Sequence, residues 1–214
     1  MIKMAGASFI LALTVPAFVP AAHADDHDRA AYYMHSFAKC VVRGDKDSVA
    51  ALLNEKPGSA EANAAMQAIG KRRSGCLKVV GGGGKLKMNS ASMRGALAEQ
   101  LYTDEFSSPP DAPVQGEQPI PFQGSGDPDL VSYDVAACMA TRDPVDTDSF
   151  VRTDVKSEAE KAALSKLAPT LANCVPTGTK LGFDRELLHG MAAEALWKMR
   201  KGVSSGPAAG QKLD

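Results

Sequence analysis

The chain lacks several short motifs that mark common enzymes and metal sites. It contains no His-Glu-x-x-His, no Cys-x-x-Cys and no phosphate loop ending in Gly-Lys-Ser or Gly-Lys-Thr. The glycine run before Lys85 does not have that ending, so it predicts a connecting loop. Zinc ligands usually stand two to four residues apart, and no two cysteines here do. Because these motifs are absent, the sequence alone points to no particular reaction and does not identify an activity.

The chain also has almost no net charge and few aromatic side chains. The chain has 214 residues with 24 basic and 25 acidic side chains, and only 6% of its residues are aromatic. Because no basic stripe is present, we expect no nucleic-acid partner. Few aromatics and abundant alanine favour closely packed helices over a β-sandwich. The length suits one domain or two small ones.

The N-terminus has the pattern of a secretory signal. Lys3 precedes an apolar stretch at residues 9–19, and Ala22-His23-Ala24 supplies small residues for cleavage before Asp25. The apolar stretch is short and broken by proline, so we do not expect it to span a membrane. We therefore predict a signal peptide at residues 1–24 and a periplasmic or secreted protein that is not membrane-embedded.

Four cysteines form two pairs with equal spacing. Cys40 and Cys76 are 36 positions apart, as are Cys138 and Cys174. Export favours disulfides, although four cysteines allow three pairings. The equal spacing favours one bridge within each pair, because each pair belongs to one copy of a repeated pattern. A bridge closing a loop of this size removes about 4 kcal/mol of unfolded-state entropy in the simple chain model.

The repeated pattern extends well beyond the cysteines. With an offset of 98 positions, Asp45 matches Asp143 and Ser59 matches Ser157, and a three-residue deletion aligns the later part. We therefore predict an all-α protein, a tandem duplication of a four-helix unit of roughly 70 residues, with pseudo-twofold packing of the two copies. The expected parts are unit 1 at 25–102, a Pro/Gly-rich linker at 103–130 without helix or central strand, unit 2 at 131–202, and a flexible tail at 203–214.

Hydrophobic periodicity and caps place the expected helices. In unit 1 they cover 27–43, 48–54, a segment from Ser59 to just before Cys76, and 89–102. In unit 2, Ser157 and Glu160 have the spacing of a capping box. Asp184 is a suitable N-cap for the last helix, and Gly202 is suited to end it.

The last helix of each unit carries the same glycine, glutamate and aromatic stripe, which we expect to line a central groove. The positions are Gly95, Glu99, Tyr102, Gly190, Glu194 and Trp197. In one interpretation the two glutamates act as acid and base of a hydrolase or lyase. The interpretation that we favour is structural: glycine allows close helix approach, and each glutamate accepts backbone N–H bonds from the loop after the second cysteine. Lys198 is a further possible partner for Glu194.

Cleavage before Asp25 would create a possible metal site. Asp25, Asp26 and His27 would then begin the chain, and an amine, two amides and an imidazole can surround Cu(II) or Ni(II) in a square plane. Incidental binding is the interpretation that we favour, and no cofactor is expected. His35 and His189 fall at different positions in the two units, so neither is expected in a shared site.

The leading hypothesis is a non-catalytic exported protein that binds another envelope or secreted macromolecule, as an inhibitor or an accessory subunit. The residues Cys174-Val-Pro-Thr-Gly-Thr, followed by an alanine-rich helix, resemble small periplasmic immunity proteins over a short part of one copy. That resemblance implies a protein partner. Copper binding, carboxylate catalysis and small-molecule carriage in the groove remain alternatives.

Overall fold

The computed structural model describes residues 24–79, 89–112, 124–176, 178 and 184–203, and helices are the only regular secondary structure in these residues. The predicted all-α class is confirmed. The helices are α1 (Ala24–Asn54), α2 (Ala60–Arg72), α3 (Ser74–Val79), α4 (Ser90–Glu105), a 3-10 turn η1 (Pro128–Leu130), α5 (Val131–Arg142), α6 (Pro144–Val151), α7 (Glu158–Cys174) and α8 (Arg185–Arg200).

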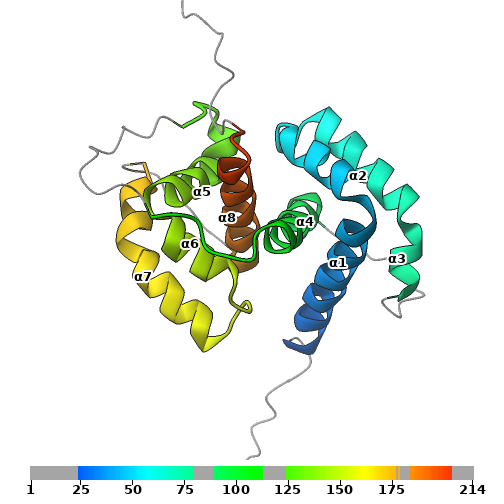
Figure 1. Ribbon diagram of the computed structural model, residues 1–214, viewed down its shortest axis with the longest axis horizontal. Helices are drawn as coiled ribbons and strands as arrows, with labels where there is room; N and C mark the ends of the chain where they lie inside the picture. The colour runs from blue at the N-terminus through cyan, green and yellow to red at the C-terminus, as the bar shows by residue number, and fades with distance from the viewer. Residues whose placement is uncertain (1–23, 80–88, 113–123, 177, 179–183, 204–214) are drawn as a thin grey trace, which may run out of the picture.

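The helices form two groups that meet along α4 and α8. Figure 1 shows α1, α2 and α3 on one side of α4, and α5, α6 and α7 around α8 on the other. One continuous apolar cluster runs through both groups and includes Leu52, Leu101, Phe150 and Leu196. None of the described helices contains an apolar stretch long enough to cross a membrane.

Both predicted disulfides are confirmed. Cys40 joins Cys76 and Cys138 joins Cys174, each with Cα atoms 5.7 Å apart. Cys76 lies on the short helix α3, whereas the sequence predicted one helix ending before it. Arg73 separates α2 from α3 and has left the helical conformation, with φ −105° and ψ 23°.

Two further helix boundaries differ from the expectation. The predicted break between the first two helices is a kink within α1 at Asp45, with φ −157° and ψ 51°. Asp143 has a similar backbone, with φ −144° and ψ 67°, between α5 and α6. The linker prediction was too broad at both ends, because α4 continues to Glu105 and η1 covers Pro128–Leu130.

Candidate functional site

The two groups of helices touch backbone to backbone where α4 crosses α8. A Cβ atom added to Gly95 would lie only 2.9 Å from the Cα of Gly190. Carbon atoms in good contact are about 3.5–4.0 Å apart, so no larger residue fits there without moving a helix. The expected role of these glycines in close helix approach therefore agrees with their position.

Beside this crossing, Glu194 forms a buried ion pair with Arg94 from the opposite helix. The Nε and Nη2 atoms of Arg94 donate to the two carboxylate oxygens at 2.7 and 2.8 Å, and Lys198 donates to the same carboxylate at 2.7 Å. Arg94 and Glu194 are 3% and 2% exposed. The pairing with Lys198 was foreseen, whereas the main partner of Glu194 is a side chain of α4 rather than a loop backbone.

Arg94 also holds the end of α1. Its guanidinium donates to the carbonyls of Leu52, Leu53 and Glu55 at 2.9–3.0 Å. These carbonyls belong to the last turn of α1 and the residue after it, where a helix leaves carbonyls without the usual N–H partner, although the N–H of Glu55 also donates to Leu52 at 3.1 Å. One buried cation therefore joins α1, α4 and α8, and its charge is compensated by Glu194. Glu194 is thereby used as a structural counter-ion.

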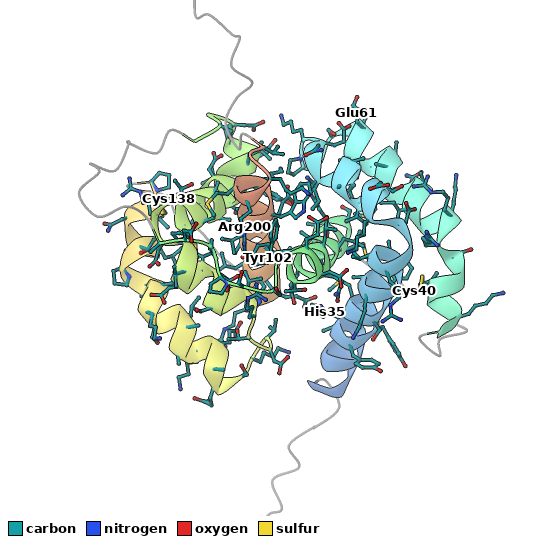
Figure 2. All side chains as sticks on the ribbon, viewed as in Figure 1. His35, Cys40, Glu61, Tyr102, Cys138 and Arg200 are labelled. Atoms are coloured by element: carbon teal, nitrogen blue, oxygen red, sulfur yellow. A yellow bond between two sulfur atoms is a disulfide. The ribbon has the colours of Figure 1, made fainter. Side chains whose placement is uncertain are left out.

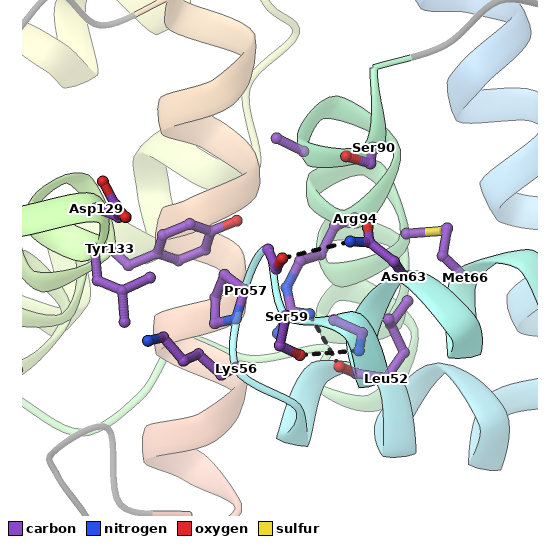
Figure 3. Close-up of a pocket in the computed structure, with 14 residues that line it drawn as sticks. Leu52, Lys56, Pro57, Ser59, Asn63, Met66, Ser90, Arg94, Asp129 and Tyr133 are labelled. Atoms are coloured by element: carbon purple, nitrogen blue, oxygen red, sulfur yellow. Dashed lines mark hydrogen bonds between the residues drawn. The ribbon is translucent and has the colours of Figure 1, made fainter. Parts of the chain in front are cut away.

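A groove of about 370 Å³ opens over Arg94 at the junction of the two groups. Figure 3 shows Tyr133 entering it from one side, opposite Asn63 and Met66 of α2. The walls combine apolar side chains with several polar ones. They are formed by Leu52, Lys56, Pro57, Gly58, Ser59, Ala62, Asn63, Met66, Ser90, Ala91, Arg94, Asp129, Leu130 and Tyr133.

Lys56, which lines the groove, forms an ion pair between the two groups. Lys56 donates to Asp127 at 2.6 Å, across the gap between the α1–α2 connection and η1. On the same side, burial raises the pKa of Tyr133 to about 12, and the negative charge of Glu194 acts in the same direction. Tyr133 therefore stays a neutral phenol at any physiological pH and can offer one hydroxyl to a ligand.

Glu99 lies in a different environment from Glu194. Its nearest ionic partner is His35 of α1, with Nδ1 and Oε1 3.8 Å apart. Burial raises the pKa of Glu99 to about 8, and the charges of Glu186 and Asp154 add to this effect. The neighbours of the two glutamates have no residue in common, so the structure gives no contact that would join them as an acid and base pair.

The two aromatic residues of the predicted stripe are core residues. Tyr102 donates its hydroxyl to Asp148, and Trp197 donates its ring N–H to Glu105 at 3.0 Å. They are 0% and 2% exposed. The groove that the structure shows is instead formed by Arg94 and by residues on α1, α2 and α5. Nothing in the sequence distinguishes Arg94 from a surface residue, because the later repeat offset places His189, and not a second arginine, at the matching position.

The side chains of the predicted copper site lie outside the described residues. The backbone of Asp25, Asp26 and His27 belongs to the first turns of α1, but their side chains fall outside the described ones. Elsewhere in the described chain, no group of three or more His, Cys, Asp or Glu residues is placed to hold a metal ion.

Comparisons with protein-family models, with curated proteins and with solved structures find no match for this chain. Its function must therefore be inferred from its own geometry.

Proposed function

We propose that the protein is an exported, non-catalytic binding protein that uses the groove over Arg94 to hold an apolar side chain or short segment of another envelope or secreted protein. The observation that carries this proposal is the composition of the groove wall. Leu52 and Met66 come from the first group of helices, and Leu130 and Tyr133 come from the second. Apolar walls with a polar, charged rim are typical of the pockets that hold anchor residues at protein interfaces.

The two disulfides support the exported part of the proposal, because such bonds persist in oxidising compartments. Glu194 supports the non-catalytic part. Its carboxylate accepts bonds from both Arg94 and Lys198, so both of its oxygens are already engaged by structural partners.

A tandem duplication with pseudo-twofold packing is part of the same proposal, and reciprocal features support it. Asp45 and Asp143 share an unusual backbone at matching positions of the repeat. Trp197 donates to Glu105, and the residue matching Glu105, Arg200, lies 6.0 Å from the ring of Tyr102, which matches Trp197. A groove between two copies follows naturally from such a duplication.

The test is affinity capture with the oxidised protein beginning at Asp25, from its own envelope extract, at low and high salt. Asn63 lines the groove and is exposed, so Asn63→Trp should fill the groove without disturbing the core. Ala64 is equally exposed but is not part of the groove wall, so Ala64→Trp is the matched control. We expect one partner that survives high salt, is lost with Asn63→Trp and is kept with Ala64→Trp. Equal capture by both variants would place the binding surface elsewhere.

Small-molecule carriage is a second candidate, favoured by the volume of the groove. About 370 Å³ is within the range of small-ligand sites, roughly 300–1,000 Å³. Native mass spectrometry of the purified protein separates the two candidates. A retained compound that is displaced by Asn63→Trp, with no captured protein, would favour the carrier.

A further inference from the structure

Positively charged side chains gather around the first disulfide, on the outer side of the first group of helices. Residues 39–48 of α1 and residues 71–78, from the end of α2 into α3, contain seven basic residues and only two acidic ones. The disulfide between Cys40 and Cys76 brings the two segments together, with Cα atoms 5.7 Å apart. Figure 2 shows Cys40 between α1 and α3, at the edge of the molecule away from α8. Six of the seven form what we call the basic face: Lys39, Arg43, Lys71, Arg72, Arg73 and Lys78.

Most of this positive charge is not neutralised within the protein. Arg72 and Arg73 share the carboxylate of Asp45, at 3.3 and 3.7 Å. Among the described residues, none of the other four members of the basic face has an ion-pair partner, and all four are exposed. The seventh basic residue, Lys46, is left out because it pairs with Asp104 of α4 at 2.6 Å. The basic face therefore presents net positive charge to solvent, although the whole chain has a formal net charge of −1.

The fold of the repeat does not require these charges. An offset of 98 positions aligns the basic face with six residues that carry no charge: Ala137, Thr141, Pro169, Thr170, Leu171 and Pro176. Arg72 donates to Asp45, and Thr170 donates its hydroxyl to the matching Asp143 at 3.2 Å. A neutral side chain thus makes the same structural bond, and the second disulfide forms without cations at these positions. The charges of the basic face therefore indicate a role outside the packing of the protein itself.

An exposed tyrosine lies on the same side of α1. Tyr32, Lys39 and Arg43 are separated by seven and four positions, a spacing that places them on one helix face. The buried Met34 and Val41 occupy the opposite face. Tyr32 is 66% exposed, and among the described residues it is the only large apolar side chain that is exposed. α1 therefore turns an aromatic ring and two cations to solvent together.

We propose that the basic face and Tyr32 form a peripheral docking surface for the anionic headgroups of a membrane. The cations come from three helices, so they form no stripe in the sequence, and their exposed positions suit a broad charged plane. Tyrosine is enriched at membrane–water interfaces, because its ring is apolar and its hydroxyl is polar. An acidic protein segment would use the cations but would not need the tyrosine. This surface is separate from the groove over Arg94, so the proposal does not depend on the proposed binding function.

The expected affinity depends on the number of charges close to the membrane. Removing one lysine or arginine near an anionic membrane weakens binding about fivefold, which corresponds to about 1 kcal/mol. At physiological ionic strength the Debye length is about 8 Å, so distant charges contribute little. Asp28, the acidic residue that precedes Tyr32, lies eleven positions before Lys39, or about 16 Å along α1. The charge of Asp28 is therefore screened from the basic face.

Cosedimentation of the oxidised protein with lipid vesicles tests the proposal. The vesicles contain either phosphatidylcholine alone or equal parts of phosphatidylcholine and phosphatidylglycerol. We expect binding to the anionic vesicles only, and we expect it to fall as salt is added. Replacing two cations, by Lys39→Gln together with Arg43→Gln, should weaken binding about twenty-fivefold. Equal binding to both kinds of vesicle, or no binding to the anionic vesicles at low salt, would overturn the proposal.

Two further pairs of substitutions locate the binding surface. Lys71→Gln together with Lys78→Gln changes two other exposed members of the basic face and should weaken binding as much as the first pair. Lys161 and Lys166 are exposed on α7, which Figure 1 shows at the edge of the molecule opposite α3. Lys161→Gln together with Lys166→Gln removes the same charge and should leave binding unchanged. Equal weakening by all three pairs would overturn the basic face as the docking surface.

The last comparison separates a membrane from an acidic protein. Tyr32→Ser should weaken binding to the anionic vesicles but leave binding to immobilised polyglutamate unchanged, because polyglutamate offers only charge. Asn63→Trp, which fills the groove, should leave vesicle binding unchanged, so failure of the groove and failure of the basic face are distinguishable. Tighter binding to polyglutamate than to the vesicles, with no effect of Tyr32→Ser on either, would overturn the membrane as the partner and favour an acidic protein.

Discussion

Replacing glycine by alanine at the contact between Gly95 and Gly190 should destabilise the protein, whereas the same replacement in an ordinary exposed helix stabilises it. In a helix, Gly→Ala stabilises by about 1 kcal/mol when the new methyl group meets nothing. Gly70 of α2 is such a position, because nothing lies within 4 Å of an added Cβ. Gly70→Ala should therefore stabilise the protein by about 0.5–1 kcal/mol.

At Gly190 the same change must push two backbones apart. An added Cβ meets the Cα of Gly95, and neither atom can move as a side chain would. Forced overpacking costs about 1–3 kcal/mol, and a backbone contact belongs at the upper end. After the helix gain of about 1 kcal/mol is subtracted, Gly190→Ala should lose about 2 kcal/mol. The two variants should thus differ by about 3 kcal/mol.

Urea denaturation followed by the fluorescence of Trp197 and by circular dichroism measures both variants against the native protein. Gly95→Ala should lose stability too, because its Cβ would lie 2.9 Å from Gly190. If Gly190→Ala were stabilised as much as Gly70→Ala, the close crossing of α4 and α8 would be refuted.

Two other predictions concern the buried ion pair and the N-terminus. Glu194→Leu should lose about 3–5 kcal/mol, because it leaves the buried charge of Arg94 uncompensated. Arg94→Met should lose less, because Lys198 still pairs with Glu194, and the double variant should lose much less than the sum of the two. Additive losses in this double-mutant cycle would contradict the pairing. If the exported chain begins at Asp25, titration should show one tightly bound Cu(II) that is lost in His27→Ala. N-terminal sequencing that finds another first residue would remove the basis for this site.

Local signals in the sequence predicted much of the fold. Ser157 accepts a bond from the N–H of Glu160 at 3.0 Å, and Asp184 accepts one from Glu186 at 2.9 Å, so both predicted N-caps are confirmed. The reciprocal half of the capping box is not formed, because the N–H of Ser157 donates to the carbonyl of Asp154 at 3.1 Å. Gly202 ends α8 with φ 68°, and the N–H of Val203 returns to the carbonyl of Lys198 at 2.8 Å. Such features depend on neighbours within a few residues, which a sequence displays directly.

The candidate sites were predicted far less well, because they depend on contacts between distant residues. Glu160 has the spacing of a capping residue, but its side chain turns to the N–H of Lys156 and to His189. His35 lies 3.8 Å from Glu99 and His189 lies 3.3 Å from Glu160, and neither pair is visible in the sequence. Arg94 on an alanine-rich helix reads as a surface residue, and only the packing of α1 and α8 shows it to be buried.

The crossing of α4 and α8 would also be a point about which the two groups of helices can rotate. Where two backbones touch without side chains between them, small rotations of one helix on the other displace few interlocking atoms. The groove over Arg94 takes its walls from both groups of helices, with Leu52 and Met66 on one side and Leu130 and Tyr133 on the other. A rotation of α4 on α8 would therefore change the width of the groove, so the two glycines would set how readily the groove adapts to what enters it.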